Sequence, residues 1–414
     1  MACLLAGSHP HAGASVAGQG VKEDSLPPVL AYYYIWFNTT SWNRAKVDIP
    51  LLGPYSSDDK EIMRQHVKWA KASGIDGFIV SWKHTETLSK RLGLLVEVSR
   101  EENFKLAIIY EGLDFYRAPL PIDRISYDLS WLSSTYGQDP VFDLFGDPVL
   151  IWSGTWKFSP EEIARVTSSQ RDRLQILASS RHVAEYEAIS DFVDGNAYYW
   201  SSVDPSTHPD YPGKLARMSD AVDAAGGLWF APAAPGFDAR HLGGEREVLR
   251  QDGATYRTEF ATALESQPDA VTLISWNEFS ENSQIEPSCQ YGDRYLEVTA
   301  EILGGTHTPV NLPCDQEALA TAKAGAQTSS PVNASLATPP PMAVGSQPFD
   351  WDSSSPQGVA DRGARMGTLV LLGMFGGLMA FSATMITRRA LHEGGSTTPH
   401  LPRESATGGN GEGQ

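Results

Sequence analysis

Three carboxylates follow the last apolar segment of the region in which apolar runs alternate with amphipathic stretches. Glu278, Glu281 and Glu286 lie within nine positions, in the segment SWNEFSENSQIE. Because Glu278 and Glu281 are three residues apart, a turn would place them on the same side of the chain. Two close carboxylates cannot both ionise at low cost, so one can donate a proton while the other acts as base or nucleophile. The alternative is an acidic loop that caps a helix N-terminus.

Short apolar or β-branched runs alternate with amphipathic stretches between residues 27 and 305. We expect helices over 58–73, 87–102, 160–168, 211–225, 254–264 and 291–302, with Asp58 as N-cap of the first. Strands that alternate with helices indicate a parallel sheet, and about eight such units fit a (β/α)8 TIM barrel. A doubly wound open sheet is the alternative, but no G-x-G-x-x-G motif follows the first strand. The expected strands are 29–36, 77–82, 105–110, 148–152, 174–179, 193–200, 227–232 and 270–276.

Aromatic and polar residues end most of these expected strands. Active sites of parallel barrels lie at the carboxyl ends of the strands, so these side chains should gather at one rim. Flat aromatic faces suit the C–H surfaces of a sugar, and carboxylates suit its hydroxyls. Packing inside the barrel wall is the alternative for Trp36 and Trp82. The strand-end residues are Tyr34, Trp36, Trp82, Glu111, Tyr198, Tyr199, Trp276 and Asn277.

The segment around the carboxylates resembles a motif of glycoside hydrolase family 99, the endo-α-mannosidase and endo-α-mannanase family. There a strand-eight N-E-W-x-E-G-T-Q-I-E run carries two catalytic carboxylates, and this chain has WNEFSENSQIEP. Further similar segments, in matching order, are LGPYSSD at 52–58, ASGIDGFIVSW at 72–82, YEG at 110–112 and APGFD at 234–238. The resemblance spans about residues 30 to 298 and implies a TIM-barrel glycosidase.

The resemblance also implies residue roles. Glu281 would be the general acid, and Glu278 the general base that deprotonates the sugar's own 2-hydroxyl, with retention at the anomeric carbon. Glu111 would hold a hydroxyl, and no metal or cofactor would be needed. The other residues expected at the substrate are Tyr34, Trp36, Trp82, Tyr198, Tyr199, Trp276, Asn277, Gln284 and Glu286.

Departures from the family pattern leave the linkage and the reaction open. Phe279 replaces one aromatic, and Ser280-Glu281-Asn282 stands where the family has His-Glu-Gly. Related barrels of polysaccharide-biosynthesis glycosyltransferases end in a similar W-N-E-W-x-E run followed by Y-G-x-x-Y-L-E, and the segment YGDRYLE at 291–297 fits that helix. A sugar transferase and a non-catalytic carbohydrate-binding surface protein are therefore the alternatives to hydrolysis.

The ends of the chain differ in composition from the expected barrel at 27–305. Residues 366–387 carry no charge and would form a helix about 33 Å long, enough to span a membrane. A buried core helix is the alternative. Gly373 and Gly377 form a GxxxG pair that can let two membrane helices approach. We expect a leader or remnant signal sequence at 1–26, a low-complexity linker at 306–365 and a polar tail at 388–414.

Charge and cysteine content restrict partners and compartment. The formal net charge of −18 argues against nucleic acid as a partner. We expect a single-pass membrane protein with a barrel outside the cytoplasm or in a lumen and a cytoplasmic tail. Cys289 and Cys314 flank the last expected helix and could pair in an oxidising compartment.

Overall fold

A computed structural model describes residues 26–43, 46–114 and 116–328 of the 414-residue chain. The expected membrane span at 366–387, its Gly373/Gly377 pair, the polar tail and nearly all of the leader lie outside these residues. Within the described ranges, no helix is both long and apolar enough to cross a bilayer.

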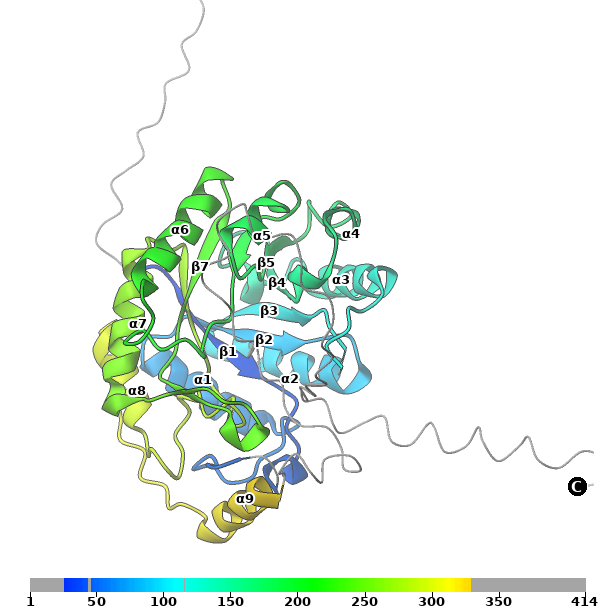
Figure 1. The fold of residues 1–414 in the computed structure, drawn as a ribbon. Coiled ribbons are helices and arrows are strands. Elements are labelled where there is room, and N and C mark those ends of the chain that lie inside the picture. Colours follow the sequence, from blue (N-terminus) through cyan, green and yellow to red (C-terminus); the bar gives the residue numbers. More distant parts are fainter. Residues whose placement is uncertain (1–25, 44–45, 115, 329–414) are drawn as a thin grey trace, which may run out of the picture. The chain divides into compact units, whose positions relative to one another are not determined.

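Eight parallel strands close into a barrel, so the (β/α)8 prediction is confirmed and the open sheet is excluded. Each strand pairs with its sequence neighbours, and the last pairs with the first through Val29 and Val271. Figure 1 shows the helices packed outside the strands. The barrel strands are β1 (Val29–Tyr34), β2 (Gly77–Trp82), β3 (Lys105–Glu111), β4 (Val149–Ser153), β5 (Gln175–Ala178), β6 (Gly195–Ala197), β7 (Leu228–Ala233) and β10 (Ala270–Leu273).

Successive side chains of each strand point alternately into the barrel interior and toward the helix layer. On β1, Tyr32 and Tyr34 belong to the interior apolar cluster, and Tyr33 between them stacks on Phe78 outside it. On β2, Ile79 belongs to the interior cluster. Period-two alternation therefore turns Ser81 inward and Trp82 outward, which decides which strand-end residues can reach a central site.

Amphipathic helices follow the strands, and capping fixes where they start. The N-cap of helix α1 is Asp59, one residue later than expected, because Asp59 accepts the backbone N–H groups of Glu61 and Ile62. Asp58 instead accepts a hydrogen bond from Arg91 at 2.7 Å. The helices are α1 (Lys60–Ala72), α2 (Glu86–Glu102), α3 (Ile122–Tyr136), α4 (Pro160–Thr167), α5 (Val183–Glu187), α6 (Tyr211–Ala224), α7 (Ala254–Glu265), α8 (Arg294–Leu303) and α9 (Gln316–Thr328).

Shorter elements shape the loops at the rim. The β7 loop carries a two-stranded antiparallel sheet of β8 (Phe237–Asp238) and β9 (Glu247–Val248). Single 3-10 turns are η1 (Thr39–Asn43), η2 (Pro140–Phe142), η3 (Thr155–Lys157), η4 (Ser190–Phe192), η5 (Arg240–Leu242) and η6 (Gln251–Gly253).

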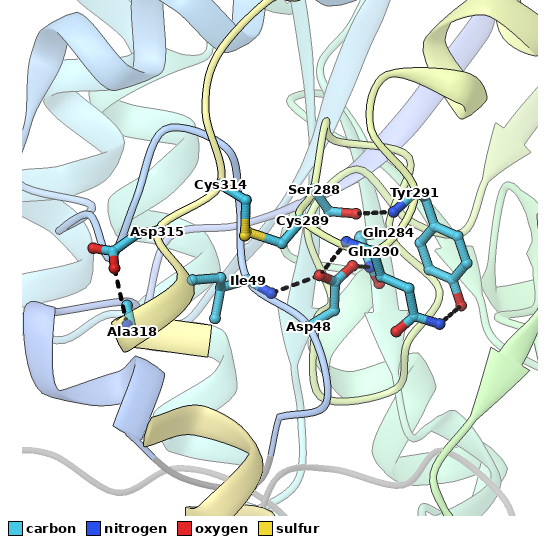
Figure 2. Close-up of a disulfide and its surroundings, with 10 residues drawn as sticks. All are labelled: Asp48, Ile49, Gln284, Ser288, Cys289, Gln290, Tyr291, Cys314, Asp315 and Ala318. Atoms are coloured by element: carbon cyan, nitrogen blue, oxygen red, sulfur yellow. Dashed lines mark hydrogen bonds between the residues drawn. A yellow bond between two sulfur atoms is a disulfide. The ribbon is translucent and has the colours of Figure 1, made fainter. Parts of the chain in front are cut away.

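Helix α9 lies within the segment expected to be a low-complexity linker. It contacts η1 and η5, and its Ala322 is fully buried in the same apolar cluster as Trp42 and Phe279. A disulfide between Cys289 and Cys314 ties the segment before α9 to the loop after β10, as Figure 2 shows. The packed domain therefore extends past residue 305 and includes α9.

Candidate active site

The loop after β10 folds back on itself and so brings both carboxylates beneath the rim. The backbone N–H of Trp276 donates to the Tyr32 carbonyl at 2.8 Å, which anchors the loop to β1. Ser275 exchanges backbone hydrogen bonds with Ser283 and Ile285, both at 2.9 Å. The Ser275 hydroxyl accepts the Glu278 N–H at 2.7 Å, so the turn that carries Glu278 is held from both sides.

Glu278 is 3 % exposed, and its carboxylate is bonded within this turn. The Ser280 N–H donates to its Oε1 at 2.9 Å. Burial raises the pKa of Glu278 to about 7, although the Lys46 cation and the Ser280 and Glu281 backbone N–H groups act to lower it. A carboxyl with such a pKa exchanges protons readily near neutral pH.

Glu281 lies beside Glu278 and shares its tyrosine neighbours. It is 1 % exposed and its Oε2 accepts a hydrogen bond from the Tyr199 hydroxyl at 3.1 Å. The hydroxyls of Tyr34 and Tyr199 also hydrogen-bond each other. Burial, then the charges of both glutamates, hold the pKa of Tyr34 well above its ordinary value. The charges of the two carboxylates thus act on the same pair of phenols.

Lys46 supplies a cation beside this pair and was missed at the sequence level. It is fully buried, and its Nζ donates to the Ser41 carbonyl at 3.0 Å. Its ammonium also lies 5.7 Å from the Phe37 ring centroid and 5.6 Å from that of Trp42. Trp42 packs edge-on against Phe279, the residue after Glu278, at 5.3 Å. A lone lysine in an irregular loop gives no sequence pattern that would have identified it.

Glu111 reaches the same side of the barrel interior from the end of β3. Its Oε1 accepts a hydrogen bond from the Ser81 hydroxyl at 2.8 Å. Burial raises the pKa of Glu111, while the charges of Lys83 and Arg117 partly offset this effect. Ser81, Lys83 and Arg117 were not among the expected site residues, although the inward position of Ser81 follows from strand alternation once its strand is known.

A small pocket of about 20 Å³, room for about one water molecule, lies over the β3 to β6 side of the barrel. Tyr34 and Tyr199 are part of its wall, so both carboxylates lie one side chain behind its surface. Ser153, Trp156 and Ser179 complete the polar and aromatic lining and carried no motif in the sequence. The pocket residues are Tyr34, Ile109, Glu111, Arg117, Ser153, Trp156, Ser179, Ala197, Tyr198 and Tyr199.

Three of the residues expected to contact sugar instead hold the loop in place. Asn277 accepts the Tyr34 N–H at 2.8 Å and donates to the Tyr34 carbonyl at 3.0 Å, so it joins the loop to β1. Glu286 is buried and accepts from the Tyr55 hydroxyl at 2.9 Å, and it pairs with His66 at 3.0 Å. Gln284 donates to Asp48 at 3.0 Å. These residues position the site rather than line it.

The expected tryptophans divide between the pocket side and the helix layer. Trp82 is fully buried and stacks on Trp131 of α3, with 5.7 Å between ring centroids. Trp276 is fully buried between Phe78 and His66. Neither lines the pocket, because Trp82 packs against α3 and Trp276 packs between β2 and α1. Trp36 is half-buried and packs 4.4 Å from Tyr34.

A second, more open hollow lies at the opposite end of the barrel. Its lining includes Gln175, Asp194 and Leu228, which stand at or just before the first residues of β5, β6 and β7. Active sites of parallel barrels lie at the carboxyl ends of the strands. The pocket beside the carboxylates is therefore the candidate site.

Comparison with known sequences agrees with this geometry. The sequence profile of glycosyl hydrolase family 99 matches residues 44–297, which is more than half of the chain. A zebrafish (Danio rerio) glycoprotein endo-alpha-1,2-mannosidase-like protein is 22% identical over 310 residues, covering 67% of this chain and 64% of its own length. The glycoprotein endo-alpha-1,2-mannosidase of Rattus norvegicus is 19% identical over 327 residues, covering 64% of this chain and 70% of its own length.

Solved structures show the same fold. The GH99 endo-alpha-mannosidase from Bacteroides thetaiotaomicron superposes with a TM-score of 0.59 at 20% identity, covering 68% of this chain and 97% of that one. The profile match over the barrel, the motif order and the shared fold agree. This chain belongs to glycosyl hydrolase family 99.

Proposed function

We propose that the chain is a retaining glycosidase that cleaves α-mannoside-type glycans or related polysaccharides. One observation carries the proposal: Glu278 and Glu281 are buried beside the same two tyrosines, next to a pocket with aromatic and acidic walls. The names of the related proteins favour an α-mannoside as substrate, because each is described as an endo-alpha-mannosidase or as similar to one.

In the first step, Glu278 takes the proton of the sugar's 2-hydroxyl, and that oxygen attacks the anomeric carbon. The glycosidic C–O bond breaks, and Glu281 gives its proton to the departing oxygen. A carboxylate whose pKa is about 7 is a stronger base than an ordinary glutamate, which suits removal of a hydroxyl proton. The Tyr199 hydroxyl fixes the orientation of Glu281 through Oε2.

In the second step, Glu281 takes a proton from water, and the water oxygen bonds to the anomeric carbon of the 1,2-anhydro sugar. The bond from the anomeric carbon to O2 breaks, and Glu278 returns the proton to that oxygen. Two inversions at one carbon give net retention. Both carboxylates end in their starting protonation states, so no cofactor enters the balance.

Access to the carboxylates requires a side chain to move. Glu278 and Glu281 are 3 % and 1 % exposed, with Tyr34 and Tyr199 between them and the pocket. A sugar that enters from the β3 to β6 side would displace one tyrosine or the loop that carries Trp36. Glu111 would then hold a hydroxyl of the bound ring.

The test is a screen of α-mannan and N-glycan fragments for release of reducing sugar without a sugar nucleotide. Release of a reducing end supports hydrolysis. Turnover only with a sugar nucleotide would support a transferase, and binding without turnover would support a carbohydrate-binding protein. A chain that ends at residue 328 is the suitable soluble form, because it keeps the Cys289–Cys314 bond and α9.

We also propose that residues 366–387 anchor the chain in a membrane, with the barrel on the extracytoplasmic or lumenal side and the tail in the cytoplasm. The disulfide supports this orientation, because such bonds persist in oxidising compartments. Gly373 and Gly377 would allow two such helices to pair. Carbonate-resistant association of the full chain with membranes, lost on deletion of 366–387, would support anchoring. Extraction of the full chain by carbonate would contradict it.

A further inference from the structure

A C-terminal strap, formed by residues 305–315 and helix α9, returns from the far end of the barrel to the rim that carries the carboxylates. Barrel helices run opposite to the strands, so α1 ends at the far end, where the Thr306 N–H donates to the Ala72 carbonyl at 2.7 Å. The Val310 N–H then donates to the side chain of Asp293, the residue before α8, at 2.7 Å. The strap therefore runs from one end of the barrel to the other.

A covalent bond and a capping contact fix the start of α9 at the rim. Cys314 is bonded to Cys289, which lies on the loop after β10 that also carries both carboxylates. The next residue, Asp315, accepts the Ala318 N–H through its side chain at 2.9 Å, so the helix begins directly after the disulfide (Figure 2). The family profile ends at residue 297, so the strap lies outside the part of the chain that the profile matches.

Helix α9 contacts the two loops that flank the catalytic loop. In the barrel, β10 lies between β1 and β7. The helix contacts η1 in the loop after β1 and η5 in the loop after β7. Its apolar side, made by Ala318, Leu319 and Ala322, packs on the interior apolar cluster. It therefore bridges the loops on both sides of the one that carries Glu278 and Glu281.

Each flanking loop in turn contacts one side of the catalytic turn. On the β1 side, Trp42 of η1 packs edge-on against Phe279, the residue after Glu278, with 5.3 Å between ring centroids. On the β7 side, the Asp238 N–H donates to the Glu281 carbonyl at 2.8 Å. Asp238 ends β8 and is joined to η5 by one residue. The two carboxylate-bearing residues are thus connected to α9 through separate loops.

We propose that the strap is a positioning element: by holding η1 and the β7 loop against the loop after β10, α9 keeps Glu278 and Glu281 in the geometry that the reaction needs. The proposal rests on the proposed roles of these carboxylates and adds an element that positions them. The strap acts through Trp42 and Asp238. Misplacement of a reacting group by about 1 Å can cost about a hundredfold in rate, so loosened loops should lower turnover more than binding.

The variant Ala322→Glu tests this positioning, because a carboxylate at this fully buried position must leave the apolar cluster and so lifts α9 from the rim. Ala320→Glu is the matched control, since it makes the same substitution at an exposed position of the same helix. Ala322→Ser keeps a small side chain and should behave like the wild type. All variants are made in the full-length chain, and thermal unfolding checks that each is folded at the assay temperature.

Amide hydrogen exchange measures the positioning without any substrate. In Ala322→Glu, peptides of η1, of β8 with η5 and of the loop after β10 should exchange at least about tenfold faster than in the wild type, because their packing against α9 is lost. Peptides of β3, β4 and β5, on the opposite side of the barrel, should exchange at the wild-type rate. Ala320→Glu should match the wild type throughout. Unchanged exchange in the catalytic loop of a folded Ala322→Glu variant would overturn the proposal.

Steady-state kinetics then connect the positioning to the reaction. On an α-mannan oligosaccharide that the wild type cleaves, Ala322→Glu should lose roughly a hundredfold in kcat while KM changes by less than about twofold. A normal kcat in a variant whose catalytic loop exchanges faster would contradict the proposal. If the wild type cleaves no α-mannoside, the proposed function fails, whereas the exchange result still decides whether the strap holds the catalytic loop.

Discussion

Replacing Lys46 by Met should move the acidic limb of the pH profile of kcat/KM toward higher pH. Lys46 is fully buried and lowers the pKa of Glu278, which nevertheless lies at about 7. An opposite charge close to a carboxylate typically lowers its pKa by about 1 to 3 units, so its loss should raise the apparent pKa to about 8 or above. At pH 6 the ionised fraction of the base would then fall from about 9% to about 1%, and kcat/KM by about ninefold.

The measurement is kcat/KM on an α-mannan oligosaccharide between pH 5 and pH 9, because this ratio reports the ionisation of the free enzyme. Lys46→Arg keeps a cation and is the control, whose limb should stay near that of the wild type. Lys46→Met activity that recovers at high pH separates a charge effect from damage to the loop. An unshifted limb in a folded Lys46→Met variant would refute the reasoning that Glu278 is the base and that Lys46 sets its ionisation.

Three further variants have expected outcomes. Because the folded-state pKa of Glu278 is raised from 4.5 to about 7, its ionisation opposes folding as the pH rises through this window. Glu278→Gln should therefore be more stable than wild type by on the order of 3 kcal/mol at pH 8 and nearly equal at pH 4, and equal urea midpoints at pH 8 would count against this. Tyr199→Phe removes the donor to Glu281 and should lower kcat by roughly tenfold, as judged by steady-state kinetics, with an unchanged kcat contradicting the contact. Replacing Cys289 and Cys314 by Ser should lower stability by about 3 kcal/mol in denaturant titrations, because their disulfide closes a 25-residue separation, and an unchanged midpoint would show that the bond does not constrain the domain.

The sequence predicted the barrel well because its strands are short, apolar and separated by amphipathic helices. All eight expected strands are present, most with ends within two residues of the prediction. Helices α1, α2, α4, α6, α7 and α8 were also expected, but α3, α5 and α9 were missed. The sequence of α3, IDRISYDLSWLSSTY, has many serines and aromatic residues and thus weak intrinsic helix propensity. Packing of Leu129 and Leu132 against the barrel wall stabilises it instead.

Amino-acid composition did not predict helix α9, which follows the barrel in the chain. The residues of α9 are rich in alanine, which reads as low complexity in a window that also contains prolines and serines. Alanine is also the strongest helix former. Ala322 is buried against the cluster that holds Trp42, a long-range contact that composition alone does not reveal.

The candidate site was predicted only in part. A sequence motif does not distinguish residues that contact the substrate from residues that hold the loop in position. Glu278 and Glu281 both act on Tyr34 and Tyr199, while Gln284 and Glu286 of the same run bond to buried partners far away in sequence. The alternation of β2 could have placed Trp82 outside the barrel, since Ser81 before it faces Glu111.

The central claim is that Glu278 and Glu281 together perform cleavage of a glycosidic bond. Its most direct test is turnover of an α-mannan oligosaccharide by the Glu278→Gln and Glu281→Gln variants, with NMR detection of the anomer first released by the wild type. The account predicts that both variants lose turnover by at least about a thousandfold while they remain folded, and that the wild type releases the anomer of the substrate linkage. Near-normal turnover in either folded variant, or release of the inverted anomer, would contradict it.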